Sequence, residues 1–193
     1  MTLVQTTERA PRDLRVPGRR IWLLAIVAAL AVAAGLLALA LTDGGDDEDG
    51  AAAGSPREVS VAELRSTAAE ASHPVYWAGA LAGRRLELTE TARGNVYVRY
   101  LPAGARVGDE RPAFTAIGSY PVTDAYRTTE RSGQRRGAIV RDAPGGGIAV
   151  WNRDSPTSVY LAYPGSDVLV EVYDPDPARA RELALSGEVG PIR

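Results

Sequence analysis

The sequence of 193 residues predicts an α+β domain, with a largely antiparallel sheet and helices near both ends, that follows one N-terminal transmembrane helix. Three features support this. First, seven or so short stretches read as β-strands, and the connections between them are too short for the crossover helices that parallel strands require. Second, helix start and stop signals lie near both ends of the region that holds these stretches. Third, a run of 21 uncharged residues precedes that region.

The transmembrane helix is expected over Ile21–Leu41. As an α-helix this run is about 31 Å long, which matches a hydrocarbon core of about 30 Å. Basic flanks of such helices stay in the cytoplasm. The sequence therefore predicts a single-pass plasma-membrane protein, anchored in the lipid bilayer, with a cytoplasmic tail of residues 1–20 and an extracytoplasmic remainder. The charges that set this orientation are Arg15, Arg19 and Arg20 before the run and Asp43, Asp46, Asp47, Glu48 and Asp49 after it.

A cleaved signal peptide is the alternative interpretation of this run. Signal peptides carry an apolar region of about 7–15 residues before a cleavage site of small residues, and Ala38-Leu39-Ala40 offers such a site. The greater length of the run favours an uncleaved anchor. Attachment through a lipid on a processed N-terminus is excluded, because it requires a cysteine and the sequence has none.

Composition divides the rest of the chain in two. Residues 42–57 are small, acidic and without periodicity, as in a flexible spacer, and residues 58–193 have the size of one domain. Because there is no cysteine, the core alone must hold this domain together. Residues 51–193 carry 17 arginines and 17 acidic residues. This neutrality gives no electrostatic argument for a nucleic-acid partner.

The first half of the domain begins with a helix. Ser60 and Glu63 form a capping box, which predicts a helix over Val61–Ala71. Further along, Thr123 is expected to cap a short helix over Asp124–Arg131. Strands are predicted over Val75–Ala78, Leu86–Thr91, Val96–Leu101 and Ala113–Ser119, the middle two as a hairpin.

The second half is predicted to contain two hairpins and a closing helix. In the last strand the three valines 168, 170 and 172 alternate with Glu171, which is expected on the opposite face and should tolerate alanine within about 0.5 kcal/mol. Asp176 can cap a helix that starts at Pro177 and ends at Ser186-Gly187. We expect the helices on one face of the sheet. The strands are predicted over Ala138–Asp142, Ile148–Asn152, Thr157–Tyr163 and Val168–Tyr173.

Three strings in the domain resemble a known group of proteins. They are HPVYWAG at residues 73–79, NVYVRYLPA at 95–103 and PTSVYLAYPGSDVLVEVYDP at 156–175. They resemble uncharacterised membrane-anchored proteins of high-GC actinobacteria, over most of residues 73–187. The resemblance implies an extracytoplasmic single domain. It implies no activity, so no catalytic residue is carried over.

No motif assigns a catalytic residue, a metal site or a cofactor. Ordinary metal sites need several His, Cys or clustered carboxylates, whereas the chain has one histidine and its densest acids, Asp46–Asp49, lie in the spacer. We interpret His73 as a helix-to-strand boundary residue, since no serine-centred motif accompanies it. The triplet Gly145-Gly146-Gly147 lacks the residues of a phosphate loop and predicts a tight turn. Two acid pairs keep carboxylate chemistry open: Glu87 with Glu90, and Asp174 with Asp176.

Aromatic and arginine side chains on predicted strands give one candidate binding surface, which comprises Tyr76, Trp77, Arg99 and Trp151. Such residues are enriched at binding hot spots where they project together. We therefore expect a non-catalytic binding or envelope-associated module, whose partner is an envelope protein or polymer. The alternative is a membrane-anchored hydrolase with a carboxylate-based site. An exposed aromatic patch would favour the first function, and a concave pocket with two carboxylates the second.

Overall fold

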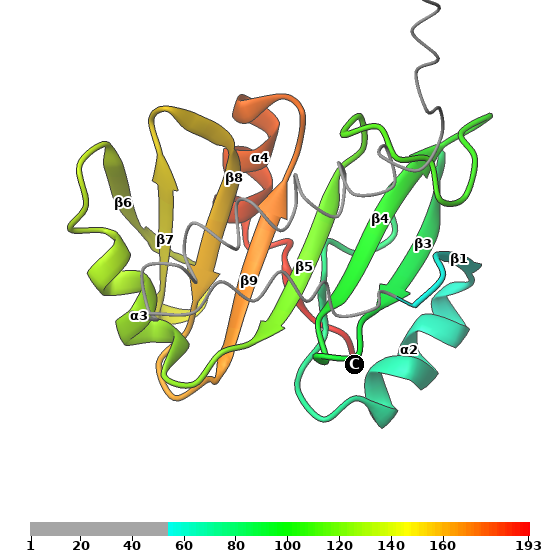
Figure 1. The fold of residues 1–193 in the computed structure, drawn as a ribbon, viewed down its shortest axis with the longest axis horizontal. Coiled ribbons are helices and arrows are strands. Elements are labelled where there is room, and N and C mark those ends of the chain that lie inside the picture. Colours follow the sequence, from blue (N-terminus) through cyan, green and yellow to red (C-terminus); the bar gives the residue numbers. More distant parts are fainter. Residues whose placement is uncertain (1–53) are drawn as a thin grey trace, which may run out of the picture.

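The computed structural model describes residues 54–193, which form one large sheet with helices on both sides (Figure 1). Eight strands of this range pair antiparallel in the order β1-β3-β4-β5-β9-β8-β7-β6, and β2 pairs with β10 in a separate ribbon. The predicted α+β class with a largely antiparallel sheet is confirmed. The strands are β1 (Arg57–Val59), β2 (Tyr76–Trp77), β3 (Arg84–Glu90), β4 (Val96–Pro102), β5 (Ala116–Pro121), β6 (Ala138–Ala143), β7 (Gly147–Asn152), β8 (Ser155–Ala162), β9 (Val168–Tyr173) and β10 (Gly190–Pro191).

The predicted transmembrane segment, Ile21–Leu41, lies outside the described residues. Between residues 54 and 193, no helix has both the length and the apolar character needed to cross a membrane.

Helices cover both faces of the sheet. α2 (Val61–Glu70) and α4 (Pro177–Ser186) contribute to the main core on one side, which we call the α4 face. α3 (Ala125–Ser132) lies on the other side, the α3 face, where Ala125 joins a second apolar cluster with Ile148, Val150 and Leu169. The expectation that all helices share one face was therefore wrong for α3. The reason is that β7, β8 and β9 carry apolar side chains on both of their faces.

The structure confirms which side chains of β8 and β9 were predicted to face the core. Val170 and Leu161 are fully buried in the core on the α4 face, together with Leu183 of α4. The opposite face of β9 was expected to be exposed, and this expectation was wrong. Glu171 is only 1% exposed, because the neighbouring strands bring hydroxyl-bearing side chains over it.

The predicted helix ends are confirmed for α2 and α4. The Ser60 side chain accepts from the Glu63 amide, and the Glu63 carboxylate accepts from the Ser60 amide. Asp176 accepts from the Ala178 amide at the start of α4, and Gly187 ends it with a φ of 85°, which glycine adopts without strain.

The start of α3 differs from the prediction. Its N-cap residue is Asp124 and not Thr123. Asp124 has φ 52° and ψ 47°, and its side chain makes no capping hydrogen bond. The backbone amide of Asp124 donates instead to the Asp167 carboxylate, which lies in the β8–β9 turn. A contact distant in sequence thus overrides the local capping preference.

Candidate functional site

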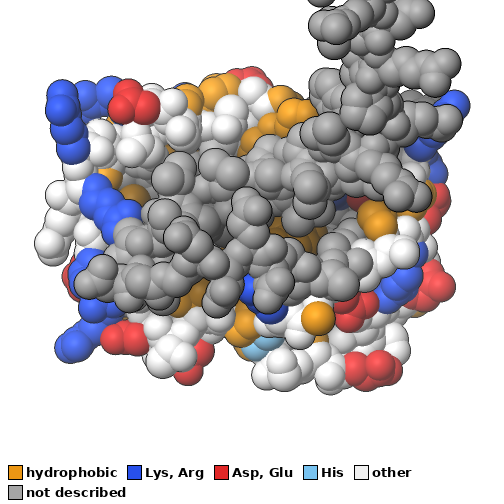
Figure 2. Space-filling view, viewed as in Figure 1, with side chains coloured by type: hydrophobic (Ala, Val, Ile, Leu, Met, Phe, Trp, Pro, Cys, Tyr) orange, Lys and Arg blue, Asp and Glu red, His pale blue; other side chains and the backbone are white. Residues whose placement is uncertain are grey.

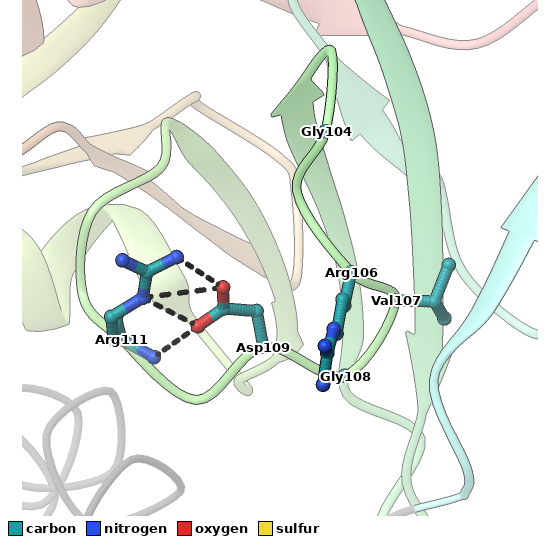
Figure 3. Close-up of a pocket in the computed structure, with 6 residues that line it drawn as sticks. All are labelled: Gly104, Arg106, Val107, Gly108, Asp109 and Arg111. Carbon is teal, nitrogen blue, oxygen red and sulfur yellow. Dashed lines mark hydrogen bonds and ion pairs between the residues drawn. The ribbon is translucent and has the colours of Figure 1, made fainter.

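The connection between β4 and β5, residues 103–115, is the longest between elements of the described range. Loops of more than about 12 residues without secondary structure are uncommon in compact domains and are often functional. This loop lines an open surface hollow of about 450 Å³ (Figure 3). We call it the β4–β5 hollow, and its lining residues are Gly104, Arg106, Val107, Gly108, Asp109 and Arg111.

Buried charges of β3 and β4 fix the loop to the α3 face of the sheet. Glu87 is completely buried, and its carboxylate accepts from the Gly108 amide and from Arg99 Nη1, both at 2.6 Å. Arg99 Nη2 in turn donates to the carbonyl of Asp109 at 2.7 Å. Hydrogen bonds between charged and neutral groups are stronger than neutral ones. The buried Glu87–Arg99 pair therefore sets the position of the loop backbone.

Further contacts secure the rest of the loop. The Arg85 guanidinium donates to the carbonyl of Ala105, the Tyr173 hydroxyl donates to the carbonyl of Pro112, and the Thr115 hydroxyl donates to Asp174. These three contacts come from β3, from β9 and from the residue that follows β9. The loop is thus held from several elements before any ligand arrives.

Inside the loop, Asp109 and Arg111 form a bidentate ion pair. Arg111 Nε donates to Asp109 Oδ1 at 3.0 Å, and Arg111 Nη2 donates to Asp109 Oδ2 at 2.6 Å. These hydrogen bonds lower the pKa of Asp109 to about 2. The guanidinium groups of Arg99 and Arg111 also lie over the ring of the buried Phe114, at 5.1 and 6.0 Å from its centroid. Both arginines are thereby oriented by an aromatic ring as well as by an anion.

Two exposed arginines line the hollow: Arg111, which pairs with Asp109, and Arg106, which takes no part in that pair. Figure 3 shows its side chain apart from the Asp109–Arg111 pair, with Val107 pointing away from that pair. The lining contains two arginines and one aspartate, which gives a net charge of +1. The hollow therefore offers a cation to an incoming group.

The carboxylates at the hollow are already engaged. Asp109 stays ionised far below neutral pH, and Glu87 accepts hydrogen bonds on both oxygens while fully buried. General acid–base catalysis needs a group that can exchange a proton near the working pH and that reaches the substrate. Asp109 lacks the first property, and Glu87, which is fully buried, lacks the second.

A second polar cluster lies at the centre of the sheet on the α3 face. Glu171 accepts from the hydroxyls of Tyr120 at 2.5 Å, Ser158 at 2.6 Å and Tyr160 at 3.4 Å. Burial raises the pKa of Glu171, and the three hydroxyl donors oppose that rise. Gly118 pairs with Glu171 across the sheet, and a Cβ there would lie 2.7 Å from the Tyr120 hydroxyl. The glycine thus leaves the space through which Tyr120 reaches Glu171.

The residues of the predicted binding surface are not brought together in one patch. Tyr76 and Trp151 are buried in the core of the α4 face, where the Tyr76 ring stacks on Tyr163 with centroids 5.9 Å apart. Trp77 is half-buried at the edge of the same core. Arg99 lies on the α3 face and belongs to the anchoring of the β4–β5 hollow.

The other residues considered from the sequence, His73 and the glycine triplet, take part in local structure. His73 places its two ring nitrogens 3.1 Å from the Pro74 carbonyl and 2.7 Å from the Gly94 carbonyl, at the boundary where it was predicted. Pro144–Gly146 make the predicted tight turn between β6 and β7, and Gly147 is the first residue of β7. No cluster of three or more His, Cys, Asp or Glu that could hold a metal ion occurs in the described part of the chain.

The two acid pairs do not form acid–base dyads. Glu87, in the middle of β3, lies on the α3 face and pairs with Arg99, whereas Glu90, the last residue of β3, pairs with Arg57. Asp174 accepts from Thr115 and from the Asp176 amide, while Asp176 caps α4. In each pair, the two carboxylates therefore take part in separate structural interactions.

Comparisons of the chain with protein-family models, with curated proteins and with solved structures found no match. The functional argument therefore rests on the geometry of the described residues.

Proposed function

We propose that this protein is anchored in the plasma membrane by one N-terminal helix and that residues 58–193 form an extracytoplasmic, non-catalytic binding module. In this proposal the β4–β5 hollow receives an anionic group, a carboxylate or a phosphate, of an envelope protein or polymer. The observation that carries the proposal is the charge arrangement of the hollow. Its one aspartate is satisfied by Arg111, and Arg106 remains exposed on a loop that is already fixed.

Preorganisation supports binding in two ways. A loop that is ordered before the ligand arrives does not lose further conformational entropy on association. A guanidinium group can also donate two parallel hydrogen bonds to one carboxylate or phosphate. Gly104 and Gly108 line the hollow together with Arg106.

The test is a titration of the full-length chain in detergent micelles with sodium phosphate and with sodium acetate. Chemical shifts of the Gly104 and Gly108 amides report on the hollow. We expect saturable shifts with at least one anion, and we expect Arg106→Gln to weaken the response by about tenfold or more, as loss of a charge-assisted hydrogen bond predicts. Arg84→Gln removes an equally exposed charge elsewhere and should leave it unchanged. Equal responses of both variants would refute the assignment.

The membrane anchor is supported by the length of Ile21–Leu41 and by the change from basic to acidic flanks across it. Reporter fusions after residue 60 test this topology separately. We expect activity from a reporter that works only outside the cytoplasm. An active cytoplasmic reporter with a silent exported one would overturn the assignment.

A further inference from the structure

The described chain enters the domain beside the β4–β5 hollow. Gly54, the first described residue, donates its amide to the carbonyl of Glu90 at the end of β3. Two residues later, the Cγ atom of Pro56 lies 3.9 Å from the point where a Cβ on Gly108 would stand. Gly108 lines the hollow, and its amide is held by the Glu87 carboxylate. The segment that precedes residue 54 is therefore tethered next to the hollow.

The sequence before this entry point is acidic. Residues 42–53 contain no basic residue and five acids, and we call residues 43–49 the acidic segment: Asp43, Asp46, Asp47, Glu48 and Asp49. The last four acids precede Gly54 by five to eight positions, a stretch of chain that covers up to about 16–26 Å. The two residues from Gly54 to Pro56 add at most about 7 Å. These carboxylates are therefore within reach of the hollow.

Arg106 is the arginine of the hollow that forms no ion pair with any residue the structure describes. Figure 2 shows acidic and basic side chains close together at the β1 and β3 end of the molecule. Three other arginines belong to the β4–β5 loop or contact it, and each pairs with one acid: Arg85 with Glu58, Arg99 with Glu87, and Arg111 with Asp109. Glu110, the other acid of the loop, does not line the hollow. The exposed charge of Arg106 therefore calls for a carboxylate from outside the described residues.

We infer that the acidic segment of the same chain binds Arg106 in the β4–β5 hollow and competes there with the anionic ligand. The inference rests on the proposed function, because it names a regulator of that same site. A guanidinium group donates hydrogen bonds to a carboxylate of its own chain as it does to a carboxylate or phosphate of a ligand. The opposite charges and the tether at Gly54 and Pro56 select this occupant.

The tether makes this competition effective, although a single exposed ion pair is weak. A group attached through a short linker acts at an effective concentration on the order of 1 mM. Five carboxylates share one guanidinium here, so several arrangements of the segment can place one of them on Arg106. An incoming anion must displace the segment. A ligand that brings several anionic groups at once is therefore favoured over free single anions.

The experiment repeats the titrations of the full-length chain in detergent micelles, with sodium phosphate and sodium acetate as the probes. The test variant neutralises four acids of the segment: Asp46→Asn, Asp47→Asn, Glu48→Gln and Asp49→Asn. The matched control makes the same change of net charge at four exposed acids that do not line the hollow: Glu70→Gln, Glu130→Gln, Asp154→Asn and Glu188→Gln. Both sets are also made together with Arg106→Gln, and thermal melts verify that each variant is folded.

We expect the test variant to bind the anion about threefold more tightly than the native chain, which corresponds to a native hollow that the segment fills about two-thirds of the time. The control should bind as the native chain does. Without added anion, the amide shifts of Gly104 and Gly108 should differ between the native chain and the test variant. This difference should disappear when both chains carry Arg106→Gln, because the two changes then act on one interaction.

A nitroxide spin label measures the contact directly. The native chain has no cysteine, so Asp47→Cys provides a single attachment site within the acidic segment. The label should broaden the amide signals of Gly104 and Gly108, and Arg106→Gln should reduce this broadening. A segment that is held near the hollow by the tether alone would broaden the signals equally with and without Arg106.

Three results would overturn the inference: equal affinities of the test and control variants, a shift difference that persists with Arg106→Gln, or label broadening that does not depend on Arg106. Each of them leaves anion binding by the hollow intact. If neither the native chain nor the test variant binds either anion, the proposed function is refuted, and the inference with it. The two failures are therefore distinguishable.

Discussion

Replacing Glu171 with alanine should destabilise the domain by about 2–4 kcal/mol, although the same change was expected to be nearly neutral from the strand pattern. Three hydroxyl donors converge on this carboxylate, from Tyr120, Ser158 and Tyr160. A buried hydroxyl left without an acceptor costs about 1–3 kcal/mol. The sum is reduced because the hydroxyls can partly pair with one another and because a costly buried carboxylate is removed.

Glu171→Gln should behave differently, because it keeps the volume and leaves acceptors for the hydroxyls. Burial raises the pKa of Glu171 above its ordinary value of 4.5. Between 4.5 and the raised value, the folded state holds a proton that the unfolded state has released. The free energy of unfolding therefore falls as pH rises through this window. The glutamine variant lacks this slope and should be more stable than the native domain at pH values above the window.

The assay is urea unfolding of residues 54–193 followed by tryptophan fluorescence, repeated over a pH series. Val170→Ala, on the opposite face of β9, should cost about 1–3 kcal/mol and serves as the reference for an apolar core site. The reasoning is refuted if Glu171→Ala changes stability by less than about 0.5 kcal/mol, which is typical of an exposed site. It is also refuted if Glu171→Gln keeps the native pH slope.

Three further predictions concern single positions. The carboxyl of Asp109 should titrate at about pH 2 by NMR, and Arg111→Gln should raise its pKa. The contribution of Asp109 to stability should be lost as the pH falls from its pKa in the unfolded chain toward 2. A pKa near 4 in the native protein would contradict this. Gly118→Ala should lower stability by about 1–3 kcal/mol in urea melts, because its Cβ would lie 2.7 Å from the Tyr120 hydroxyl; a neutral result would exclude the close approach. Thr129→Val should raise stability by about 1 kcal/mol, since Thr129 Oγ1 is buried without a partner among the described residues; a loss of stability in thermal melts would show that it has one.

Local signals predicted most elements of the fold. Capping residues such as Ser60 and Asp176 act within a few positions along the chain, so their pattern is visible in the sequence. Hairpins were recognisable because adjacent strands and their turn residues are also close in sequence. The short strands β1 and β10 were not predicted, because each depends on pairing with a distant strand and contains only two or three residues.

Features that depend on distant contacts were missed. The placement of α3 depends on which face of β7 to β9 remains uncovered after α4 has packed on β8 and β9, and no local pattern encodes this. The burial of Glu171 depends on hydroxyls from two other strands. A sequence signal for it existed, since Glu171 is the one charged residue within the apolar strand β9. That signal indicates an unusual position without naming its partners.

The candidate site was partly visible in the sequence. Arg99 was predicted as part of a binding surface with Tyr76, Trp77 and Trp151; in the structure its guanidinium lies instead over Phe114, which was not among the predicted residues. Its ion pair with Glu87 across the β3–β4 ladder and its hydrogen bond to the Asp109 carbonyl could not be predicted, because they depend on strand register and on the course of a long loop. The length of the β4–β5 loop was the one feature of the sequence that could have indicated a site there.

The α3 face buries two carboxylates in different ways, and the difference explains why the hollow lies over β3 and β4. Glu171 at the centre of the sheet is satisfied by hydroxyls alone and is only 1% exposed, so its cluster is closed to solvent. Glu87 is satisfied by a cation and by a loop amide, and Arg99 carries that interaction onward to the loop carbonyl at Asp109. Removing one member of a buried ion pair is usually more damaging than replacing both, because an unpaired charge remains. The Glu87–Arg99 pair therefore joins β3 and β4 to each other and also fixes the position of the loop that follows β4. A binding hollow requires a loop that is fixed in this way.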